Sequence, residues 1–458
     1  MKKFIKVFFF KFNYQIERVS TFHFSFKKVS IQDKDYYKYF LLHLKKNFKA
    51  LIKKYSYCHL FEFENFQRLL DHQSKKIFKS LKNYSEKKKN WLKNQPNEIK
   101  NCDYISSNTF IGAIGNYTNL YTLILAQKYK LKKKNKILCE VPKNAKINNN
   151  ALASYFLKHV QLIRKNQSLL YKKKEIPLGV ITEINNKFVR IAEARNIILQ
   201  KVKKKKIFQF KITKKHENFG RRTLRKIGLN SSKDWFVTLH IRQYGWRGET
   251  IKNTNEKHRT PNPGNYIPAI NEITSKGGNV ILVGNNNYNF PKIKNFFNYA
   301  NSSIKSEIMD IYLAANSKFC IGNSSGFFTI AQYFGTPVLL TDGPSHTDYF
   351  TLHERDIYLP RIIFKKNIDQ KKVKINLRMF DYPLNSLYSD NHFERLNLDF
   401  RENTPEEIRQ AVLEMLNRSV NSSSLQNKFK RDLNKILKKN NLIAFADLPD
   451  YFLKKHYL

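Results

Sequence analysis

Between residues 235 and 341, short apolar runs alternate with helical patterns, and only short loops separate them. Apolar runs typical of buried strands cover residues 235–239, 279–283, 318–321 and 336–341. Patterns with helical spacing lie between them, over residues 266–275, 306–315 and 327–334. A chain that alternates strands with helices folds into a parallel sheet with helices on its faces. We therefore predict a doubly wound α/β domain over residues 229–370.

A second α/β pattern precedes this domain. It predicts a strand, a glycine turn, a helix and a strand, at residues 104–111, 112–116, 120–129 and 136–141. Residues 151–205 have a mainly helical pattern, and a further helix is predicted at 217–228. Together these elements predict a Rossmann-like domain over residues 101–228.

The two ends of the chain differ from these domains. Residues 1–100 contain no glycine and are rich in lysine and aromatic residues. They predict a basic N-terminal extension with helical patches, for example at 39–51. Residues 371–458 predict C-terminal helices and a basic tail. Within them, Thr404, Pro405 and Glu407 form the pattern of a capped helix N-terminus.

The charge of the chain is strongly positive, because 84 Lys and Arg face 36 Asp and Glu, a net charge of +48. Only 15 glycines and 13 prolines occur in 458 residues, while residues with A/T-rich codons abound. Codon bias is therefore the favoured explanation of the lysines, and the alternative is a basic surface that attracts anionic partners. The lysine runs are scattered, so we expect contact with an anionic membrane surface rather than with a specific nucleic acid.

Composition excludes several classes of protein. Hydrophobic residues make up 41% of the chain, which is too much for a mainly disordered protein. No stretch approaches the ~18 uncharged apolar residues of a membrane span. Four cysteines in so long a chain form no disulfide framework. We expect a cytoplasmic protein, with possible peripheral attachment to the inner face of the membrane.

Glycine is scarce, and 10 of the 15 glycines lie between Gly245 and Gly343. Under a bias against glycine, those that remain should stand where a Cβ is not tolerated, as in tight turns or beside a ligand. We therefore expect the functional centre in this part of the chain, with Gly245 and Gly284 beside the ligand.

The motif Asn323-Ser324-Ser325-Gly326 lies between a predicted strand and a predicted helix. The N–H groups at such a helix start point outward and the helix dipole is positive there, which favours a diphosphate. The serine hydroxyls would add donors, and Gly326 would let the ligand approach. The alternative is that the serines only cap the helix.

A second motif, His240-Ile241-Arg242, follows the strand predicted at 235–239. Ligands of open α/β sheets bind at the carboxyl ends of the strands. Arg242 has the planar fork suited to phosphate, and Arg259 is a further candidate contact. His240 is a candidate acid or base, and Glu249 in the same loop is a candidate catalytic carboxylate. The alternative is that His240 and Arg242 serve the fold alone.

These motifs carry a family resemblance over residues 217–345. The segment resembles a bacterial family of glycosyltransferases. The serine–glycine loop, with its helix and Phe334-Gly335-Thr336-Pro337, is similar to the donor domain of GT-B enzymes such as heptosyltransferases. The His-x-Arg motif resembles that of fucosyltransferase-like enzymes, whose arginine contacts the donor diphosphate. Here that arginine is Arg242, but Gln243 and Tyr244 replace the Arg-Asp that follows in those enzymes, which argues against fucose.

The resemblance implies a GT-B-like fold in which two Rossmann-like domains face a cleft. It implies a metal-independent hexosyl- or fucosyl-like transferase that moves sugar from a nucleotide-diphosphate-sugar to a glycan or lipid-linked saccharide, in cell-surface polysaccharide synthesis. The donor is a substrate, and we expect no cofactor.

The chemistry of the site stays open in three respects. No matching position supplies the catalytic base, for which Glu249, Asp342 and Glu354 are candidates. The pattern Asp33-Lys34-Asp35 has no strand before it, and we expect neither a metal ion nor covalent serine chemistry. Three alternative functions remain: a sugar-nucleotide epimerase of similar fold, a basic protein that binds polyanions or nucleic acid, and a catalytically inactive scaffold that binds the donor without transfer.

Overall fold

The structure of the protein is a computed structural model that divides into two compact units, residues 1–86 and 87–458. It describes residues 14–18, 24–28, 102–105, 107–165, 181–185, 187–202, 207–230, 233–244, 256–344, 348–366, 373–375, 377–380, 393–394, 397–418 and 421–458. In the first unit, β1 (Tyr14–Arg18) pairs with β2 (Phe24–Lys28) as an antiparallel ribbon. The helical patch predicted at 39–51 lies outside the described residues.

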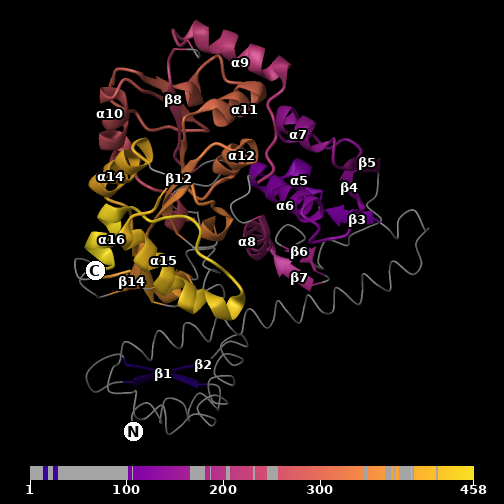
Figure 1. Cartoon of the computed structure of the whole chain (residues 1–458). Coiled ribbons are helices and arrows are strands. Elements are labelled where there is room, and N and C mark those ends of the chain that lie inside the picture. Colours follow the sequence, from indigo (N-terminus) through magenta and orange to yellow (C-terminus); the bar gives the residue numbers. More distant parts are fainter. Residues whose placement is uncertain are drawn as a thin grey trace. The chain divides into compact units, whose positions relative to one another are not determined.

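The second unit contains a six-stranded parallel sheet in its C-terminal part (Figure 1). The order of its strands is β10 (Phe296–Asn298), β9 (Asn279–Val283), β8 (Phe236–His240), β11 (Cys320–Gly322), β12 (Val338–Gly343) and β13 (Ile357–Pro360). Apart from the edge strand β10 and His240, these strand residues are buried, as expected for a parallel sheet covered on both faces. The predicted doubly wound α/β fold is confirmed for this part of the chain.

The strand order reverses in the middle of the sheet. The chain runs outward from β8 through β9 to β10, returns to the other side of β8 at β11, and continues to β12 and β13. The loops that leave β8 and β11 therefore run in opposite directions, and in open α/β sheets the carboxyl ends of two such strands are the usual place for a ligand. This reversal selects one place on the sheet as the natural site for a ligand.

Helices cover both faces of the sheet. In Figure 1, α10 (Ile267–Ser275) and α14 (Pro405–Leu416) lie on one face, and α11 (Glu307–Asn316) and α12 (Gly326–Phe334) lie on the other. Local sequence sets their ends: the Ser306 side chain caps α11 by accepting the Met309 N–H, and Gly335, with φ of 86°, ends α12 in the left-handed conformation.

A smaller parallel sheet forms the N-terminal part of the second unit. Its strands are β3 (Cys102–Ile105), β4 (Lys136–Pro142) and β5 (Gln161–Lys165), with β4 in the middle. The helices α6 (Tyr117–Lys128), α7 (Asn150–Phe156) and α8 (Ile191–Val202) complete it, with the antiparallel pair β6 (Ile181–Ile184) and β7 (Lys187–Arg190). The predicted strand–turn–helix–strand unit is therefore present.

Two sequence predictions in this part are wrong. Residues 108–111, predicted as strand, form the short helix α5 (Asn108–Ile111), in which Phe110 is fully buried. The mainly helical pattern predicted for 151–205 contains the strands β5, β6 and β7. In both places the segments are too short for periodicity to distinguish a helix from a strand.

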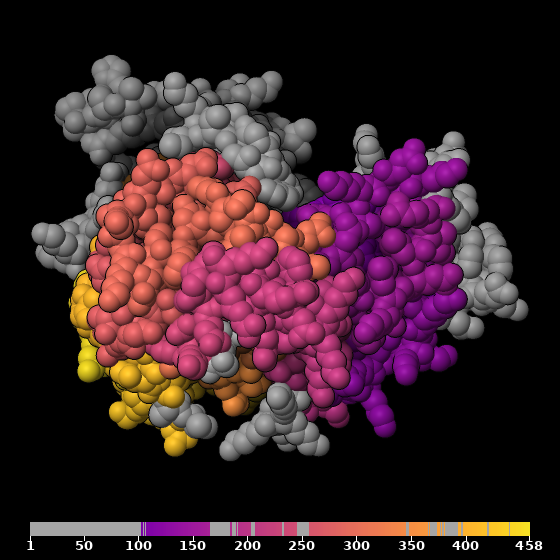
Figure 2. All heavy atoms as spheres, turned by 90° about the horizontal axis from the view of Figure 1, so that it is seen from above, coloured from indigo at the N-terminus to yellow at the C-terminus, as the bar shows by residue number. Residues whose placement is uncertain are grey.

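Residues 207–230 join the two sheets. They include α9 (Lys214–Lys226), which packs on α11, and Figure 2 shows this segment (pink) lying across the boundary between the two parts of the second unit. The boundary is also packed with aromatic side chains, since the rings of Tyr121 on α6 and Tyr333 on α12 have their centroids 4.7 Å apart. The two parts are thus in firm contact.

The C-terminal helices pack on the larger sheet. The helix α14 begins with the predicted capping box, in which the Thr404 side chain accepts the Glu407 N–H and the Glu407 carboxylate accepts the Thr404 N–H. It packs against α10 and against α16 (Asp450–His456), and the buried face of α15 (Ser424–Leu437) includes Phe429 and Leu433. A second antiparallel pair joins β14 (Ile362–Lys365) to β15 (Leu398–Arg401).

The carboxylate of Glu407 ties these C-terminal elements together. It is fully buried and accepts hydrogen bonds from Arg401 on β15 at 2.9 and 3.1 Å and contacts Nε2 of His456 on α16 at 2.7 Å. Burial raises the pKa of Glu407, but the bonds from His456 and Arg401 outweigh it and hold the pKa well below its usual range.

No helix in the described part of the chain combines the length and the apolar character needed to cross a membrane.

Replacing Glu407 by glutamine should lower the free energy of unfolding by about 3 kcal/mol, because it removes a fully buried carboxylate and leaves the charge of the partly buried Arg401 without its partner. Glu406→Gln is the matched control, since the Glu406 side chain is 45% exposed, and it should cost about 1 kcal/mol or less. The measurement is urea unfolding as a function of pH.

The pH dependence of the Glu407 variant has a definite sign. Because the folded-state pKa is depressed, the carboxylate stabilises the fold above its ordinary value of 4.5 and loses this effect as the pH falls. The difference between wild type and Glu407→Gln should therefore shrink in acid. A difference that grows below pH 4.5 would contradict the role given to the carboxylate.

Candidate functional site

The predicted site residues come together at the reversal point of the large sheet. His240 is the last residue of β8 and Arg242 follows it, Gly284 follows β9, and the loop of Ser324 and Ser325 follows β11. Arg259 reaches the same place from the loop after β8, where its Nη2 donates to the Ser324 carbonyl at 2.6 Å. Gly245 and Glu249 lie outside the described residues, so their predicted roles stay predictions.

His240 is held by three neighbours. Its Nδ1 lies 3.1 Å from the Ser325 hydroxyl, and its ring is stacked on that of Phe327 at an angle of 5°. Gly284, with φ of 87°, leaves room for the imidazole, because an added Cβ would come within 2.8 Å of Nε2. Burial and the charge of Arg242 lower the pKa of His240 to about 4, so the ring is neutral at neutral pH.

Ser325 does not act as a simple helix cap. It occupies the N-cap position of α12 with extended backbone, but its side chain makes no capping hydrogen bond and contacts His240 instead. The structure therefore does not bear out the alternative in which the serine only caps the helix. The amino end of α12, with its positive dipole end, is directed toward the site.

A carboxylate missed in the sequence, Glu256, lies between the two arginines. Its Oε2 accepts a short hydrogen bond from Nη2 of Arg242, and its Oε1 lies 3.4 Å from Nη1 of Arg259. Two guanidinium groups thus converge on one acidic group beside the amino end of α12. An anionic group of similar size, such as a phosphate, suits the same arrangement.

A second carboxylate missed in the sequence is Asp348, which follows β12 at the start of a short 3-10 helix, Asp348–Thr351. Burial raises its pKa, against the opposing effects of a hydrogen bond with the Ser324 side chain and the charge of Arg259. A carboxyl group with a raised pKa beside charged groups at a strand end is suited to proton transfer. The only sequence signal for it was its position just after a predicted strand.

The Asn323 side chain lies in the interior beneath the candidate site and positions the loops that form it. The side chain is fully buried: its Oδ1 accepts the Arg242 N–H at 2.9 Å, and its Nδ2 donates to the Tyr266 hydroxyl at 2.7 Å and to Thr341 Oγ1 at 3.1 Å. The amide is thus engaged by the protein itself. The predicted donor contact of Asn323 stays a prediction, and its observed bonds give it a positioning role.

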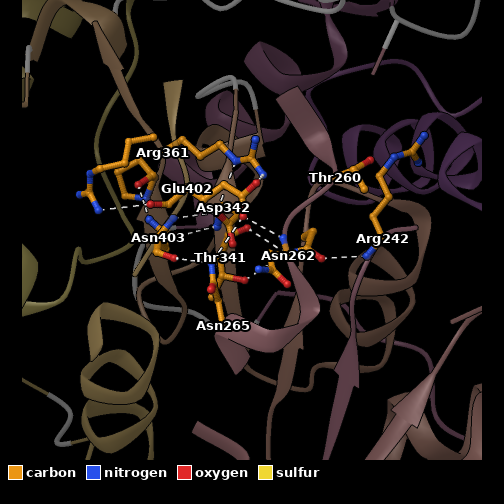
Figure 3. Close-up of polar contacts among 12 residues, drawn as sticks. Arg242, Thr260, Asn262, Asn265, Thr341, Asp342, Arg361, Glu402 and Asn403 are labelled. Carbon is orange, nitrogen blue, oxygen red and sulfur yellow. Dashed lines mark hydrogen bonds and ion pairs between the residues drawn. The ribbon is translucent and has the colours of Figure 1, made fainter. Parts of the chain in front are cut away.

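The polar network continues from Asn323 to Asp342 (Figure 3). Asp342 is fully buried, and its carboxylate accepts bonds from the Tyr266 hydroxyl at 2.9 Å and from the Asn403 N–H at 2.9 Å. It also lies 3.3 Å from Nε of the buried Arg361. Figure 3 shows the Arg242 side chain pointing away from this cluster, to which its backbone N–H is joined.

Two of the carboxylates predicted as candidate bases do not lie where a base for the acceptor would have to be. Asp342 has no exposed surface and is occupied by Tyr266, Asn403 and Arg361, so it cannot reach an acceptor. Glu354 lines a pocket with Lys318 and Pro337, which precede β11 and β12. That pocket is at the amino edge of the sheet, on the opposite side from His240.

Gly326 forms a close contact between the two parts of the unit, and its predicted role beside a ligand stays a prediction. A Cβ added to Gly326 would lie 2.6 Å from the backbone nitrogen of Gly115, in the 3-10 turn Ile114–Asn116 after α5. The turn after β3 and the start of α12 therefore touch through their backbones. This contact brings the carboxyl edge of the small sheet next to that of the large one.

The loop also matches the Gly-x-Ser-x-Gly pattern of hydrolase nucleophile elbows, at residues 322–326, between a strand and a helix. Ser324 would be the nucleophile. The imidazole of His240, however, contacts the hydroxyl of Ser325, while the Ser324 side chain bonds to Asp348. Ser324 and His240 therefore do not form the serine–histidine pair that would activate a nucleophile. The sequence pattern by itself does not indicate a hydrolase.

In chemical terms the site offers cationic groups, a helix amino end, a neutral imidazole and carboxylates. Among the residues that the structure describes, no three His, Cys, Asp or Glu side chains are grouped so as to hold a metal ion. Arg242 and Arg259 can bind and stabilise a phosphate, and Asp348 can exchange a proton.

Gly326→Ala should destabilise the protein by about 1–3 kcal/mol, because the added methyl group meets the backbone of Gly115. Gly115→Ala should cost less, since its methyl group would lie 3.3 Å from the Gly326 Cα. Thermal unfolding of both variants measures which of the two is less stable. If Gly326→Ala were the more stable of the two, the close backbone contact would be refuted.

No family model matches the chain, and no curated protein matches it in sequence. Solved structures similar to the chain include a glycosyl transferase of family 9 from Veillonella parvula, at 11% sequence identity and a TM-score of 0.43, covering 70% of this chain and 98% of that chain. Another is TibC, an iron-containing dodecameric glycosyltransferase from enterotoxigenic E. coli, at 12% identity and a TM-score of 0.32, covering 64% of this chain and 74% of that chain. TibC with ADP-D-beta-D-heptose gives 11% identity, a TM-score of 0.31 and the same coverage.

Proposed function

We propose that the protein is a glycosyltransferase of GT-B type that uses a nucleotide-diphosphate-sugar as donor. The observation that carries the proposal is the convergence of Arg242 and Arg259 beside the amino end of α12, at the reversal point of a doubly wound sheet. Diphosphates bind at this place in such sheets, and the sequence motifs that resemble glycosyltransferases fall on it.

In the proposed mechanism the arginines stabilise the leaving diphosphate. Negative charge grows on the phosphate oxygens as the bond from the anomeric carbon to the diphosphate breaks. Arg242 and Arg259, which now contact Glu256, would turn to the phosphates, and the N–H groups of α12 would add further donors. This electrostatic stabilisation needs no metal ion.

We further propose Asp348 as the group that accepts the proton of the acceptor hydroxyl. It lies beside Ser324 and Arg259, and its raised pKa makes it a stronger base than an ordinary aspartate. His240, neutral and bonded to Ser325, would hold the loop and contact the sugar or phosphate. The acceptor is a glycan or lipid-linked saccharide of the cell surface, reached by a cytoplasmic enzyme on the inner face of the membrane.

The donor is tested by thermal shift with nucleoside diphosphates and their sugars. A ligand at about 100 times its dissociation constant stabilises the fold by about 2.7 kcal/mol, and Arg242→Ala should remove most of this shift. Arg225→Ala on the exposed face of α9 is the matched control and should keep it. An unchanged shift in Arg242→Ala would refute the proposed site.

The screen also separates the proposed function from its alternatives. If no nucleotide stabilises the folded protein, the transferase proposal fails. Turnover of a bound nucleotide-sugar without any acceptor, to an isomer of the same mass, would identify an epimerase instead.

Asp348→Asn should reduce sugar transfer by roughly 10²–10⁴-fold while donor binding is kept, because an amide cannot accept the proton. The measurement is release of nucleoside diphosphate from the donor found in the screen, with mixed glycan acceptors. Glu354→Gln, at the opposite edge of the sheet, should transfer at the wild-type rate. Full activity in Asp348→Asn would exclude it as the base.

A further inference from the structure

A cavity of 1070 Å³ opens at the edge of the small sheet that faces away from the candidate site. Its walls come from the start of β4, the start of β5 and the ends of α6 and α7. These segments lie at the amino ends of the parallel strands, whereas the turn that touches Gly326 follows the carboxyl end of β3. The length of β4, seven residues at about 3.3 Å each, separates the two edges by roughly 20 Å.

The charged side chains that line this cavity are all basic. Seven lysines line it, Lys128, Lys130, Lys158 and four in the segment 132–136, and none of its lining residues is acidic. The whole chain has 84 basic to 36 acidic residues, so seven basic side chains would on average be accompanied by about three acidic ones. The cavity therefore has fewer acidic residues than the composition of the chain would place there on average.

Most of these ammonium groups are not engaged with carboxylates of the described residues. Lys132 is the exception, since it lies 3.0 Å from Asp103 behind the wall. Lys128 lies over the ring of Phe208, 4.5 Å from its centroid. The pKa of His159 in the wall is lowered by burial and by the charges of Lys128 and Lys158, in keeping with a positive potential in the cavity.

Buried apolar side chains also line the cavity. Leu131, Ile137 and Val160 line it and are 8%, 2% and 7% exposed, as parts of the core of the small sheet. Gln161 stands beside the lysines, whereas the Gln127 amide already donates to the Asp103 carboxylate at 2.9 Å and to the Asn135 carbonyl at 3.0 Å. The cavity thus combines buried apolar side chains with several charged groups on long side chains.

We propose that this cavity binds a ligand with two or more phosphate groups, at a site separate from the donor site. Several ammonium groups around one cavity favour an anion with several charges close together, and phosphate oxygens are strong acceptors for them. The volume is sufficient for more than a single phosphate. Phosphates of this kind occur on soluble metabolites and on lipid headgroups, and the same lysines would receive both.

The test uses inorganic tripolyphosphate and isothermal titration calorimetry at low salt. The site variant Lys133→Gln/Lys134→Gln/Lys158→Gln should bind it at least about tenfold more weakly than wild type, because exposed charge contacts are lost. The control variant Lys211→Gln/Lys226→Gln/Lys233→Gln removes the same charge at exposed positions near and on α9, and should bind as wild type does.

The source of the phosphates is decided with vesicles of phosphatidylcholine, with and without phosphatidic acid. Binding to phosphatidic acid vesicles that the site variant loses and the control variant keeps would assign a lipid headgroup. Tripolyphosphate binding without vesicle binding would assign a soluble ligand. Either result supports the site.

Three outcomes would overturn the proposal. Equal losses in the site and control variants would mean that only the overall charge matters. No binding of tripolyphosphate or vesicles by wild type would leave the cavity without this ligand. Tighter site-dependent binding of a short RNA than of tripolyphosphate would assign a nucleic acid instead. Arg242→Ala should bind tripolyphosphate in the cavity normally, so failure of the proposed function would not affect this result.

Discussion

The side chain of Asn323 hydrogen-bonds to three segments that are far apart in the sequence. It accepts the backbone N–H of Arg242 after β8 and donates to Tyr266 before α10 and to Thr341 on β12. Because the amide is buried, losing any one partner would leave a polar group unsatisfied in the interior. The loop of β8 and the loop of β11 are therefore held at a fixed separation, and the geometry of the candidate site depends on that separation.

The charged groups of the site are arranged in two layers with different tasks. Asp342 and Arg361 are buried in the lower layer, where low polarity makes their positions costly to change. Arg242, Arg259 and Glu256 form the upper layer, are partly exposed and contact one another. The upper layer can exchange partners with a ligand while the lower layer keeps the strand ends in place. If the same charged groups both held the strand ends and bound the ligand, ligand binding would break the contacts that hold the strand ends in place.

The sequence predicted the large sheet well because its strands are apolar on both faces and its helices have clear ends. The edge strands β10 and β13 were missed, since three or four residues carry no clear pattern. His240, Arg242 and the serine loop could be predicted because ligands of open α/β sheets bind at the carboxyl ends of strands, and those strand ends could be located in the sequence. Glu256 and Asp348 could not, because only the folding of their loops brings them to Arg259.

The meeting of Gly115 and Gly326 has a mechanical consequence. Side chains at an ordinary contact can change rotamer and so absorb a small displacement, but two glycine backbones have no such freedom. The contact therefore fixes how closely the two sheets approach each other at this point, because any closer approach would drive backbone into backbone. The distance between the small sheet and the amino end of α12 is thus set by main-chain atoms, which side-chain rearrangement cannot adjust.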